Sequence, residues 1–250
     1  NDRHDGTSRQ RAVRTIEVAM RKLPAARPGG VRPVLVLVGT DLPAEGNCNA
    51  RLQRAVEVRS ETGDPAKTFL ECTGSDGLTL LADAHGAQYE LQGFGLRDAR
   101  GAGITVGEHA NASLRHVRVE RCNARAEGTF GGVRVQRDAY LEVHDSVIEA
   151  NRATDGGGVH CQHATLVMTR NNHVSKNRAA RHGGGVYGER CRVDLQSGLN
   201  VEENWAGSDG GGLYVAGGQL HLGNGPVSAN HAGRNGGGVA ARDGASVDAQ

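Results

Sequence analysis

The second half of the chain repeats one pattern of apolar and polar positions every 26 or 27 residues. One marker is a run of two or three glycines followed by an aliphatic residue, which is Val133, Val159, Val186, Leu213 or Val239 in successive units. The other is an aliphatic residue three positions before an asparagine, which is Asn151, Asn177, Asn204 or Asn230. Two markers that share one period indicate a repeat architecture.

Between these markers, each unit has apolar residues at alternating positions, as in Leu141-Glu142-Val143. Alternation with a period of two predicts a β-strand with one buried face. The pattern therefore predicts three short strands in each unit. One follows the glycines, one contains the two alternating apolar residues, and one ends at the asparagine. Because one coil cannot bury its own apolar side, the coils must stack. The pattern predicts an all-β solenoid, a right-handed parallel β-helix.

The two markers have physical roles at the corners of such a coil. The glycines Gly156, Gly183, Gly210 and Gly236 permit a positive φ and a close approach of neighbouring coils. An asparagine tolerates the left-handed conformation, and asparagines stacked in successive coils can bond one another as a ladder. We therefore expect structural roles for these glycines and asparagines.

The first part of the chain has a different pattern. Apolar positions at helical spacing predict a helix over residues 8–23, with a capping box from Thr7 to Gln10. A continuous apolar strand, Val34–Val38, follows. A helix at this place can cover the open end of the solenoid, whose strand edges would otherwise promote aggregation.

The chain is expected to form one continuous domain with three parts. These are the capping helix and first strand over residues 1–40, irregular coils over 41–130 and regular repeats over 131–250. In the irregular part, strands are expected near Val56–Arg59, Thr68–Cys72, Leu78–Leu81 and Tyr89–Leu96. The first residue is not Met, and the chain ends in mid-pattern, so we expect a fragment with a truncated C-terminus.

The amino-acid composition agrees with a solenoid and argues against some classes of partner. Glycine is 38 of 250 residues and aromatics are 3%, which favours many tight turns around a thin aliphatic core. Lys and Arg number 29 against 28 Asp and Glu, so the charge gives no reason to expect a nucleic-acid partner. The longest apolar run is Val34–Val38, so no membrane insertion is expected of this segment.

Five cysteines leave at least one thiol without a partner in the same chain. Cys48 and Cys72 both lie beside turn-like sequence and are expected to form a disulfide if the protein is exported. Cys161 and Cys191 fall at inward positions of adjacent coils, where they either bond or serve as small apolar core residues. Cys122 is then the odd thiol.

Several segments carry a family resemblance. They are the run from Val56 to Gly63, the segment Thr68-Phe69-Leu70-Glu71-Cys72, the segment Leu91–Leu96 and the two repeat markers. Together they resemble bacterial β-helix repeat proteins of the polymorphic-outer-membrane-protein type. The resemblance implies an exported protein, since many such proteins are surface adhesins or autotransporter passengers, and others have a pectate-lyase label from fold similarity. This chain has Val, Ile or Leu where those repeats often have Phe before x-x-Asn.

No residue is assigned to catalysis, to a cofactor or to a metal. His160 and Cys161 point to opposite faces of a strand, which argues against a metal site with His163. The calcium-binding Gly-Gly-x-Gly-x-Asp nonapeptide is absent, so calcium has no support beyond Asp155 and Asp209 before the glycine runs.

The sequence is consistent with two functions. The first is an exported or cell-surface binding or structural module, secreted or associated with the outer membrane, with a glycan or cell-surface ligand as its partner. The alternative is a polysaccharide lyase or glycoside hydrolase for acidic glycans. An enzyme would need a groove with two or more acids and a basic residue, for which Arg134, Arg170 and Arg192 are candidates. The binding module is preferred, and the oligomeric state is left open.

Overall fold

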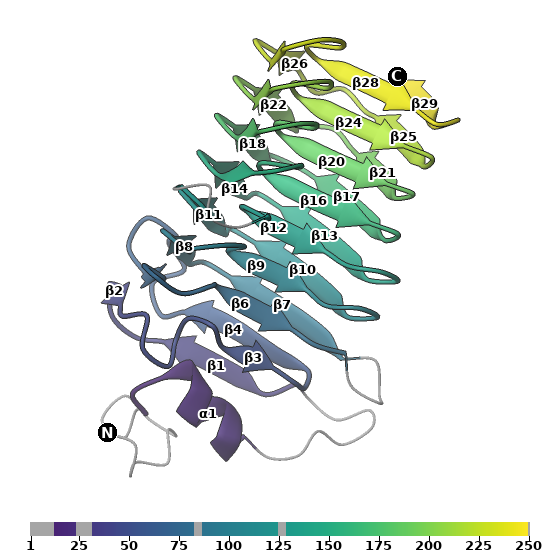
Figure 1. Ribbon diagram of the computed structural model, residues 1–250. Helices are drawn as coiled ribbons and strands as arrows, with labels where there is room; N and C mark the ends of the chain where they lie inside the picture. The colour runs from purple at the N-terminus through teal and green to yellow at the C-terminus, as the bar shows by residue number, and fades with distance from the viewer. Residues whose placement is uncertain (1–12, 24–31, 83–86, 125–128, 250) are drawn as a thin grey trace.

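The computed structural model describes residues 13–23, 32–82, 87–124 and 129–249. Its coils wind around a common axis, and successive coils contribute parallel strands to the same three sheets (Figure 1). Each strand pairs in register with the equivalent strands before and after it, so that β12 (Val133–Val135) lies between β9 (Ile104–Val106) and β16 (Val159–Gln162). The prediction of a right-handed parallel β-helix is confirmed, and its three main sheets correspond to the three strands predicted for each coil.

The three sheets are called A, B and C in the order in which the chain visits them. Sheet A comprises β1 (Val34–Leu37), β4 (Val56–Ser60), β7 (Gln88–Gln92), β10 (Asn111–Arg115), β13 (Tyr140–His144), β17 (Thr165–Thr169), β21 (Arg192–Leu195), β25 (Gln219–Leu222) and β29 (Ser246–Ala249). Sheet B comprises β2 (Asp41–Leu42), β5 (Phe69–Glu71), β8 (Gly95–Arg97), β11 (Arg118–Glu120), β14 (Val147–Glu149), β18 (His173–Ser175), β22 (Asn200–Glu202) and β26 (Val227–Ser228). Sheet C comprises β3 (Arg51–Leu52), β6 (Leu78–Leu80), β9, β12, β16, β20 (Val186–Glu189), β24 (Leu213–Ala216) and β28 (Val239–Arg242).

The regular coils contain one strand more than the sequence predicts. A two-residue strand between sheets B and C forms the four-stranded sheet D, which comprises β15 (Arg152–Ala153), β19 (Arg178–Ala179), β23 (Trp205–Ala206) and β27 (His231–Ala232). Its inward position is the alanine two residues after each ladder asparagine, as in Ala179 and Ala206, which are both fully buried. Two residues are too short to show an alternating pattern, which is why the sequence did not reveal this strand.

The core is a continuous aliphatic column along the axis of the solenoid. Alternate strand residues point inward, so that Leu141, Leu166 and Val193 occupy equivalent places in sheet A and are at most 1% exposed. The large aromatic residues of the core, Tyr89 and Phe94, are both in the irregular coils, and the Tyr89 hydroxyl donates to Leu52 O at 2.8 Å. Because each layer of the core is thin and filled by aliphatic side chains, the chain needs few aromatic residues to fill it.

The helix α1 (Ile16–Lys22) lies at the N-terminal end of the stack (Figure 1). Ile16 and Met20 are buried in the same apolar cluster as Leu35 and Leu37, so the helix covers the first coil. Residues 13–15 are not helical, and the N-cap is Thr15, whose side chain accepts from Val18 N at 3.3 Å. The predicted helix was therefore too long, and its capping box from Thr7 to Gln10 lies outside the described residues.

The four repeat asparagines form a hydrogen-bonded ladder inside one corner of the solenoid. The Asn177 Nδ2 donates to Ile148 O at 2.9 Å and to Asn204 Oδ1 at 3.1 Å, and the same pattern continues from Asn151 to Asn230. The side-chain oxygens of Asn177, Asn204 and Asn230 also accept the backbone N–H of the asparagine one coil earlier. The left-handed residue is not the asparagine but the one before it, such as Lys176 with φ 56°. This turn geometry frees the asparagine side chain to point inward.

The glycine runs lie at the turn into sheet C. The first glycine of each triplet, Gly156, Gly183, Gly210 or Gly236, has φ between 62° and 68°. At later glycines of the triplets, a Cβ would meet the backbone of the next coil, because at Gly212 it would be 2.7 Å from Gly238 O. The first glycine of a triplet is thus needed for its positive φ, and the later glycines are needed because the backbone of the next coil lies so close.

One predicted strand of the irregular part was wrong. The segment Tyr89–Leu96 was expected to be continuous, but the chain turns at Gly93, which has φ 69°. The first half belongs to β7 in sheet A and the second half to β8 in sheet B. A corner without a glycine run has no marker in the repeat pattern, so the alternating apolar residues merge into one apparent strand.

Candidate functional site

The outward face of sheet C has a row of side chains along the axis of the solenoid. Each of these residues stands between two residues at inward-facing positions. The pairing of neighbouring strands in sheet C places these residues side by side. In order from the N-terminal end, the row is Arg51, Thr79, Thr105, Arg134, His160, Tyr187, Tyr214 and Ala240. Neighbouring strands are about 4.8 Å apart, so the row offers one side chain per coil at that spacing.

A groove of about 400 Å³ is hollowed into the first half of this row. Thr79 and Thr105 form its floor, and Asp76, Arg100, Thr129, Phe130 and Arg134 also line it. The lining thus combines three hydroxyls, two guanidinium groups, one carboxylate and one aromatic ring. We call this feature the sheet C groove.

Arg134 lies at the end of the sheet C groove nearest the regular coils. Its guanidinium carbon is 3.9 Å from the centre of the Phe130 ring, a cation–π contact that holds the side chain in place. The Phe130 ring in turn meets the edge of His160, with ring centres 4.9 Å apart. Burial lowers the pKa of Arg134. A half-buried cation on an aromatic wall therefore closes this end of the groove.

A stack of rings continues the row beyond Arg134. His160 stacks on Tyr187 at 4.9 Å between ring centres, and Tyr187 stacks on Tyr214 at 5.4 Å with the two planes 2° apart. Burial raises the pKa of Tyr187 to about 12, and Glu189 and Asp155 add to the shift. Stacked pairs across neighbouring strands stabilise the sheet, and this explains the stack without a ligand.

His160 is 8% exposed, and its Nδ1 is buried without a hydrogen-bond partner among the described residues. Burial lowers the pKa of His160 to about 4, and Arg134 adds to the shift, whereas Asp155 and Glu189 oppose it. His160 is therefore neutral at pH 7.

We expect this buried neutral histidine to make stability depend on pH. An unfolded histidine takes a proton below about pH 6.5, which folded His160 refuses until about pH 4. The free energy of unfolding should therefore fall by about 1–3 kcal/mol as the pH drops through this window. Urea unfolding at several pH values should show a flatter profile for His160→Gln than for wild type. The exposed-site control His116→Asn should keep the wild-type slope, and equal slopes for all three proteins would contradict the assignment.

Two buried aspartates flank the row on the side of the glycine turns. Asp155 Oδ1 accepts His182 N at 3.0 Å, and its other oxygen is paired with Arg181. Asp209 Oδ1 accepts from the backbone and side chain of Asn235, at 3.1 and 2.9 Å. Burial raises the pKa of Asp209, but these hydrogen bonds and the charges of Arg234 and Arg242 outweigh burial and keep it below its usual range. Both carboxylates are thus committed to holding adjacent coils together.

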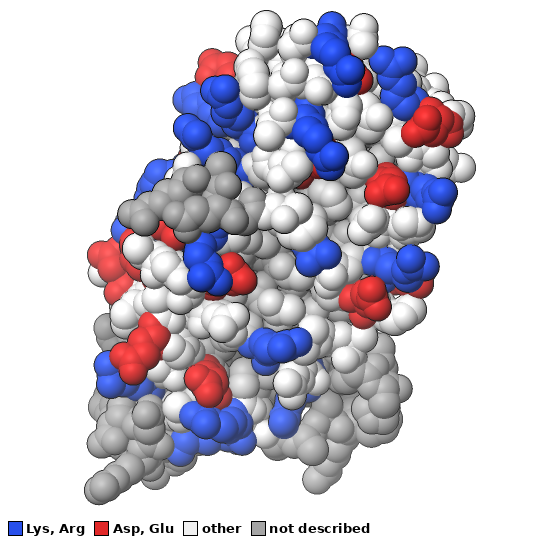
Figure 2. All heavy atoms as spheres, in the orientation of Figure 1, with Lys and Arg blue, Asp and Glu red and all other residues white. Residues whose placement is uncertain are grey.

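Positive side chains are spaced along the middle of the view in Figure 2, which shows the outer faces of sheets C and A. In the same view, most acidic side chains lie toward the two borders of the face, and uncharged residues fill the area between the charges. Within the row on sheet C, the charged residues are Arg51 and Arg134, both positive, and the other members carry no charge at pH 7. Such a surface attracts ligands with a negative charge.

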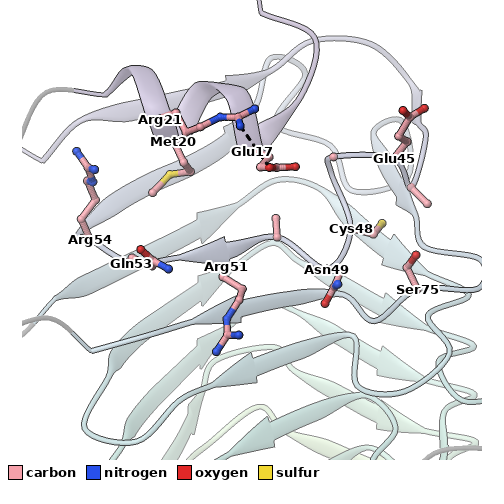
Figure 3. Close-up of a pocket in the computed structure, with 13 residues that line it drawn as sticks. Glu17, Met20, Arg21, Glu45, Cys48, Asn49, Arg51, Gln53, Arg54 and Ser75 are labelled. Atoms are coloured by element: carbon pink, nitrogen blue, oxygen red, sulfur yellow. Dashed lines mark ion pairs between the residues drawn. The ribbon is translucent and has the colours of Figure 1, made fainter.

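A larger cavity of about 570 Å³ lies between α1 and β3 (Figure 3). It has two carboxylates, those of Glu17 and Glu45, but their side chains are 61% and 86% exposed. Glu17 pairs with Arg21 at 3.7 Å, and Arg54 donates to the end of the helix at Leu23 O at 2.9 Å. Solvated and paired charges of this kind fit the packing boundary between the helix and the first coil better than a catalytic site.

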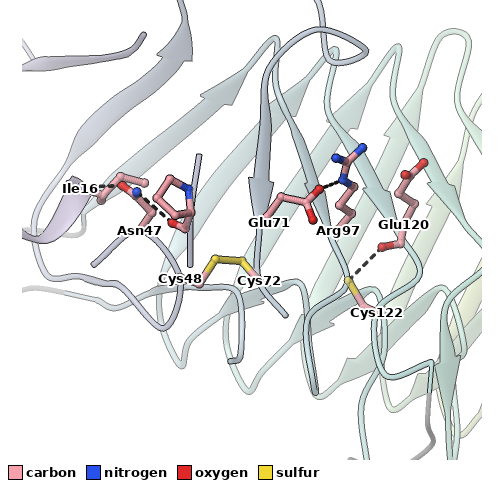
Figure 4. The surroundings of a disulfide bond; sticks show 9 residues. Ile16, Asn47, Cys48, Glu71, Cys72, Arg97, Glu120 and Cys122 are labelled. Atoms are coloured by element: carbon pink, nitrogen blue, oxygen red, sulfur yellow. Dashed lines mark hydrogen bonds and ion pairs between the residues drawn. A yellow bond between two sulfur atoms is a disulfide. The ribbon is translucent and has the colours of Figure 1, made fainter. Parts of the chain in front are cut away.

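The five cysteines form two disulfides and leave one free thiol. One disulfide joins Cys48 to Cys72 near the N-terminal end, and Asn47 beside it accepts from Ile16 N at 3.0 Å, which ties α1 to the same turn (Figure 4). A second disulfide joins Cys161 to Cys191. Cys122 is the free thiol, fully buried, and burial raises its pKa to about 12. It occupies the ladder position of its coil, since Cys122 N donates to Asn151 Oδ1 at 2.9 Å.

The arginines considered for an enzyme do not come together. Arg134 lines the sheet C groove, Arg170 lies in a turn with φ 63°, and Arg192 is on the outer face of sheet A with Asp194 at 3.9 Å. Within residues 13–23, 32–82, 87–124 and 129–249, no group of three or more His, Cys, Asp or Glu side chains is placed to hold a metal. No helix of the described part is long and apolar enough to cross a membrane.

Sequence reasoning missed the sheet C groove, although a signal was present. The steps Leu78-Thr79-Leu80, Ile104-Thr105-Val106 and Val133-Arg134-Val135 each put one polar residue between two inward aliphatic residues. Once sheet C is known, these central residues must lie side by side on its outer face. The other lining residues, such as Asp76 and Arg100, come from turns that do not repeat, and the sequence has no marker for them.

Comparison with family models supports the β-helix fold independently of the structure. The model described as the right-handed beta helix region matches residues 79–250, which is more than half of the chain. No curated protein and no solved structure gives a significant match. The fold is compatible with structural and binding modules and with pectate-lyase-like or glycosidase-like enzymes. The chain belongs to the right-handed beta helix region family.

Proposed function

We propose that this protein is an exported β-helix module that binds a glycan in the sheet C groove. The observation that carries the proposal is the lining of the groove. Three threonine hydroxyls, one carboxylate and two guanidinium groups can bond the hydroxyls of a sugar, and the Phe130 ring adds an apolar wall. A mainly polar recess with one aromatic ring suits a polyhydroxylated ligand.

The direction of the groove supports an extended ligand. The row on sheet C runs along the solenoid axis with one outward side chain per coil. Its spacing of about 4.8 Å is close to the length of one pyranose unit along an extended glycan, so successive sugars meet successive coils. Residues of three coils line the groove, which makes room for a short oligosaccharide.

Binding without cleavage is the activity that we propose. The buried carboxylates nearest the ring stack, Asp155 and Asp209, are engaged by backbone N–H groups and arginines. A glycosidase needs a pair of carboxylates across the scissile bond, one of them with a raised pKa, whereas that of Asp209 is lowered. The only carboxylate that lines the sheet C groove among the described residues is that of Asp76.

An exported location is part of the proposal. Two disulfides are compatible with an oxidising compartment and would be unusual in a cytosolic protein. We propose a secreted or outer-membrane-associated protein of the polymorphic-outer-membrane-protein type, on the basis of its glycine and asparagine repeat markers. Protease treatment of intact source cells should remove the protein if it is exposed at the surface, while recovery only after lysis would contradict this part.

A glycan array tests the binding function. We expect wild-type protein to retain a set of glycans and Thr105→Trp to lose them, because the indole fills the floor of the groove. The control Thr165→Trp makes the same change on the outer face of sheet A, away from the groove, and should bind as wild type does. Equal retention by all three proteins, or no retention by any, would refute a glycan site in the sheet C groove.

A further inference from the structure

We propose that Arg134 is an anion-binding residue of the sheet C groove and that the ligand is therefore an acidic glycan, with a carboxylate or sulfate group at Arg134. This inference rests on the proposed glycan-binding function and adds the class of ligand to it. It comes from the surroundings of Arg134, which differ from those of other arginines that are shielded from water.

Three other arginines that are partly shielded from water have acidic partners. The side chains of Arg32, Arg97 and Arg118 are 33%, 25% and 32% exposed, and each has a carboxylate oxygen within 3.4 Å. Half-buried Arg134 has no carboxylate within 4.0 Å in the described part of the chain, and its close partner is the neutral Phe130 ring. Glu108 acts on it only at longer range. Among the described residues, Arg134 is thus a half-buried cation without a close counter-ion, and the anionic group of a ligand can supply one.

The groups beside Arg134 extend the anion site. Thr105 precedes it in the row, and its hydroxyl can donate to an oxyanion. His160 follows it in the row; this residue is 8% exposed, and its Nδ1 is buried without a hydrogen-bond partner among the described residues. Arg100 adds a second positive charge to the lining of the groove.

The two ends of the sheet C groove differ in charge, which sets the direction of the ligand. Asp76 precedes β6, whereas Arg134 lies on β12, two coils further along. Two coil spacings amount to about 10 Å, so the two groups can meet different sugar units. The Asp76 carboxylate repels an anion and accepts from sugar hydroxyls. We therefore place the acidic group of the ligand at the Arg134 end and neutral hydroxyls at the Asp76 end.

Calorimetric titration of the full chain with matched oligosaccharides tests this inference. The probes are a uronic-acid trisaccharide, its methyl ester, which has no charge, and a sulfated trisaccharide. We expect wild-type protein to bind at least one of the two anionic probes at least about tenfold more tightly than the methyl ester. Arg134→Gln should remove this difference, because it weakens the binding of the anionic probes more than that of the ester.

Two further variants separate charge recognition from general damage. Arg178 stacks on Trp205 at 3.9 Å outside the groove, so Arg178→Gln removes the same kind of arginine–ring contact and should bind as wild type does. Arg134→Lys keeps the charge and should retain part of the preference for the anionic probe. All variants are compared at equal folded fraction by circular dichroism.

The outcomes distinguish the two proposals. A preference for the uronate assigns a carboxylate to the site, and a preference for the sulfated probe assigns a sulfate, and both support an acidic ligand. Equal affinity of wild type for the ester and the anionic probes, or an unchanged preference in Arg134→Gln, overturns the role of Arg134 and leaves glycan binding intact. Failure of wild type to bind any probe, together with an empty glycan array, overturns both.

Discussion

Gly212→Ala is expected to destabilise the protein by about 3 kcal/mol, whereas Gly238→Ala changes stability by less than about 0.5 kcal/mol. Both are the third glycine of a triplet at the turn into sheet C. At Gly212, an added Cβ would be 2.7 Å from Gly238 O and 2.9 Å from Asn230 Nδ2, so the next coil would have to move. At Gly238 the nearest heavy atom would be 3.5 Å away, which is ordinary contact.

Comparing Gly212→Ala with Gly238→Ala separates the effect of close coil stacking from the effect of glycine on backbone freedom. Neither glycine has a positive φ, so both substitutions lose the same backbone freedom in the unfolded chain. Urea unfolding followed by circular dichroism gives the two midpoints under identical conditions. Equal midpoints would mean that the close approach of coils does not explain the glycine triplets.

Asn177→Ala is expected to lower the free energy of unfolding by about 3 kcal/mol. Asn177 is 1% exposed, and its amide makes four hydrogen bonds, two of them as donor and two as acceptor. Alanine leaves the Asn151 N–H and the Ile148 carbonyl buried without these partners, and water has no access to replace them. The large effect thus comes from unsatisfied backbone groups rather than from lost packing.

Asn230→Ala is the control for the ladder. Asn230 has the same contacts toward the preceding coil, with Nδ2 to Val201 O at 2.8 Å, but it is partly exposed. Water can therefore satisfy the freed groups, and we expect a loss of about 1 kcal/mol. Thermal unfolding of both variants measures the difference, and a loss for Asn230→Ala as large as that for Asn177→Ala would contradict a ladder whose strength depends on burial.

The regular coils could be predicted from sequence because stacking requires the same residue type at the same place in every coil. Asn151, Asn177 and Asn204 are each bonded to the next ladder member, so none of them can change independently of the stack. This coupling between coils appears in the sequence as a fixed period. The departures are local: a strand of two residues and the corner at Gly93 leave no periodic signal.

The candidate site was harder to predict for the opposite physical reason. Asp76, Arg100 and Arg134 come from three coils and line one groove, but no stacking requirement makes them alike. Their proximity depends on the register of sheet C in coils whose lengths vary. Regular repeats report what the scaffold needs, whereas a binding site is built from the residues that the scaffold leaves free.

The central claim is that this β-helix binds acidic glycans in the sheet C groove and does not cleave them. One incubation of wild-type protein with a uronic-acid polymer tests it, with retardation of the protein in a polymer-containing gel and the chain length of the polymer measured on the same sample. We predict retardation that Thr105→Trp abolishes and a polymer of unchanged length. A shortened polymer with unsaturated or new reducing ends, or migration unaffected by the polymer, would contradict the claim.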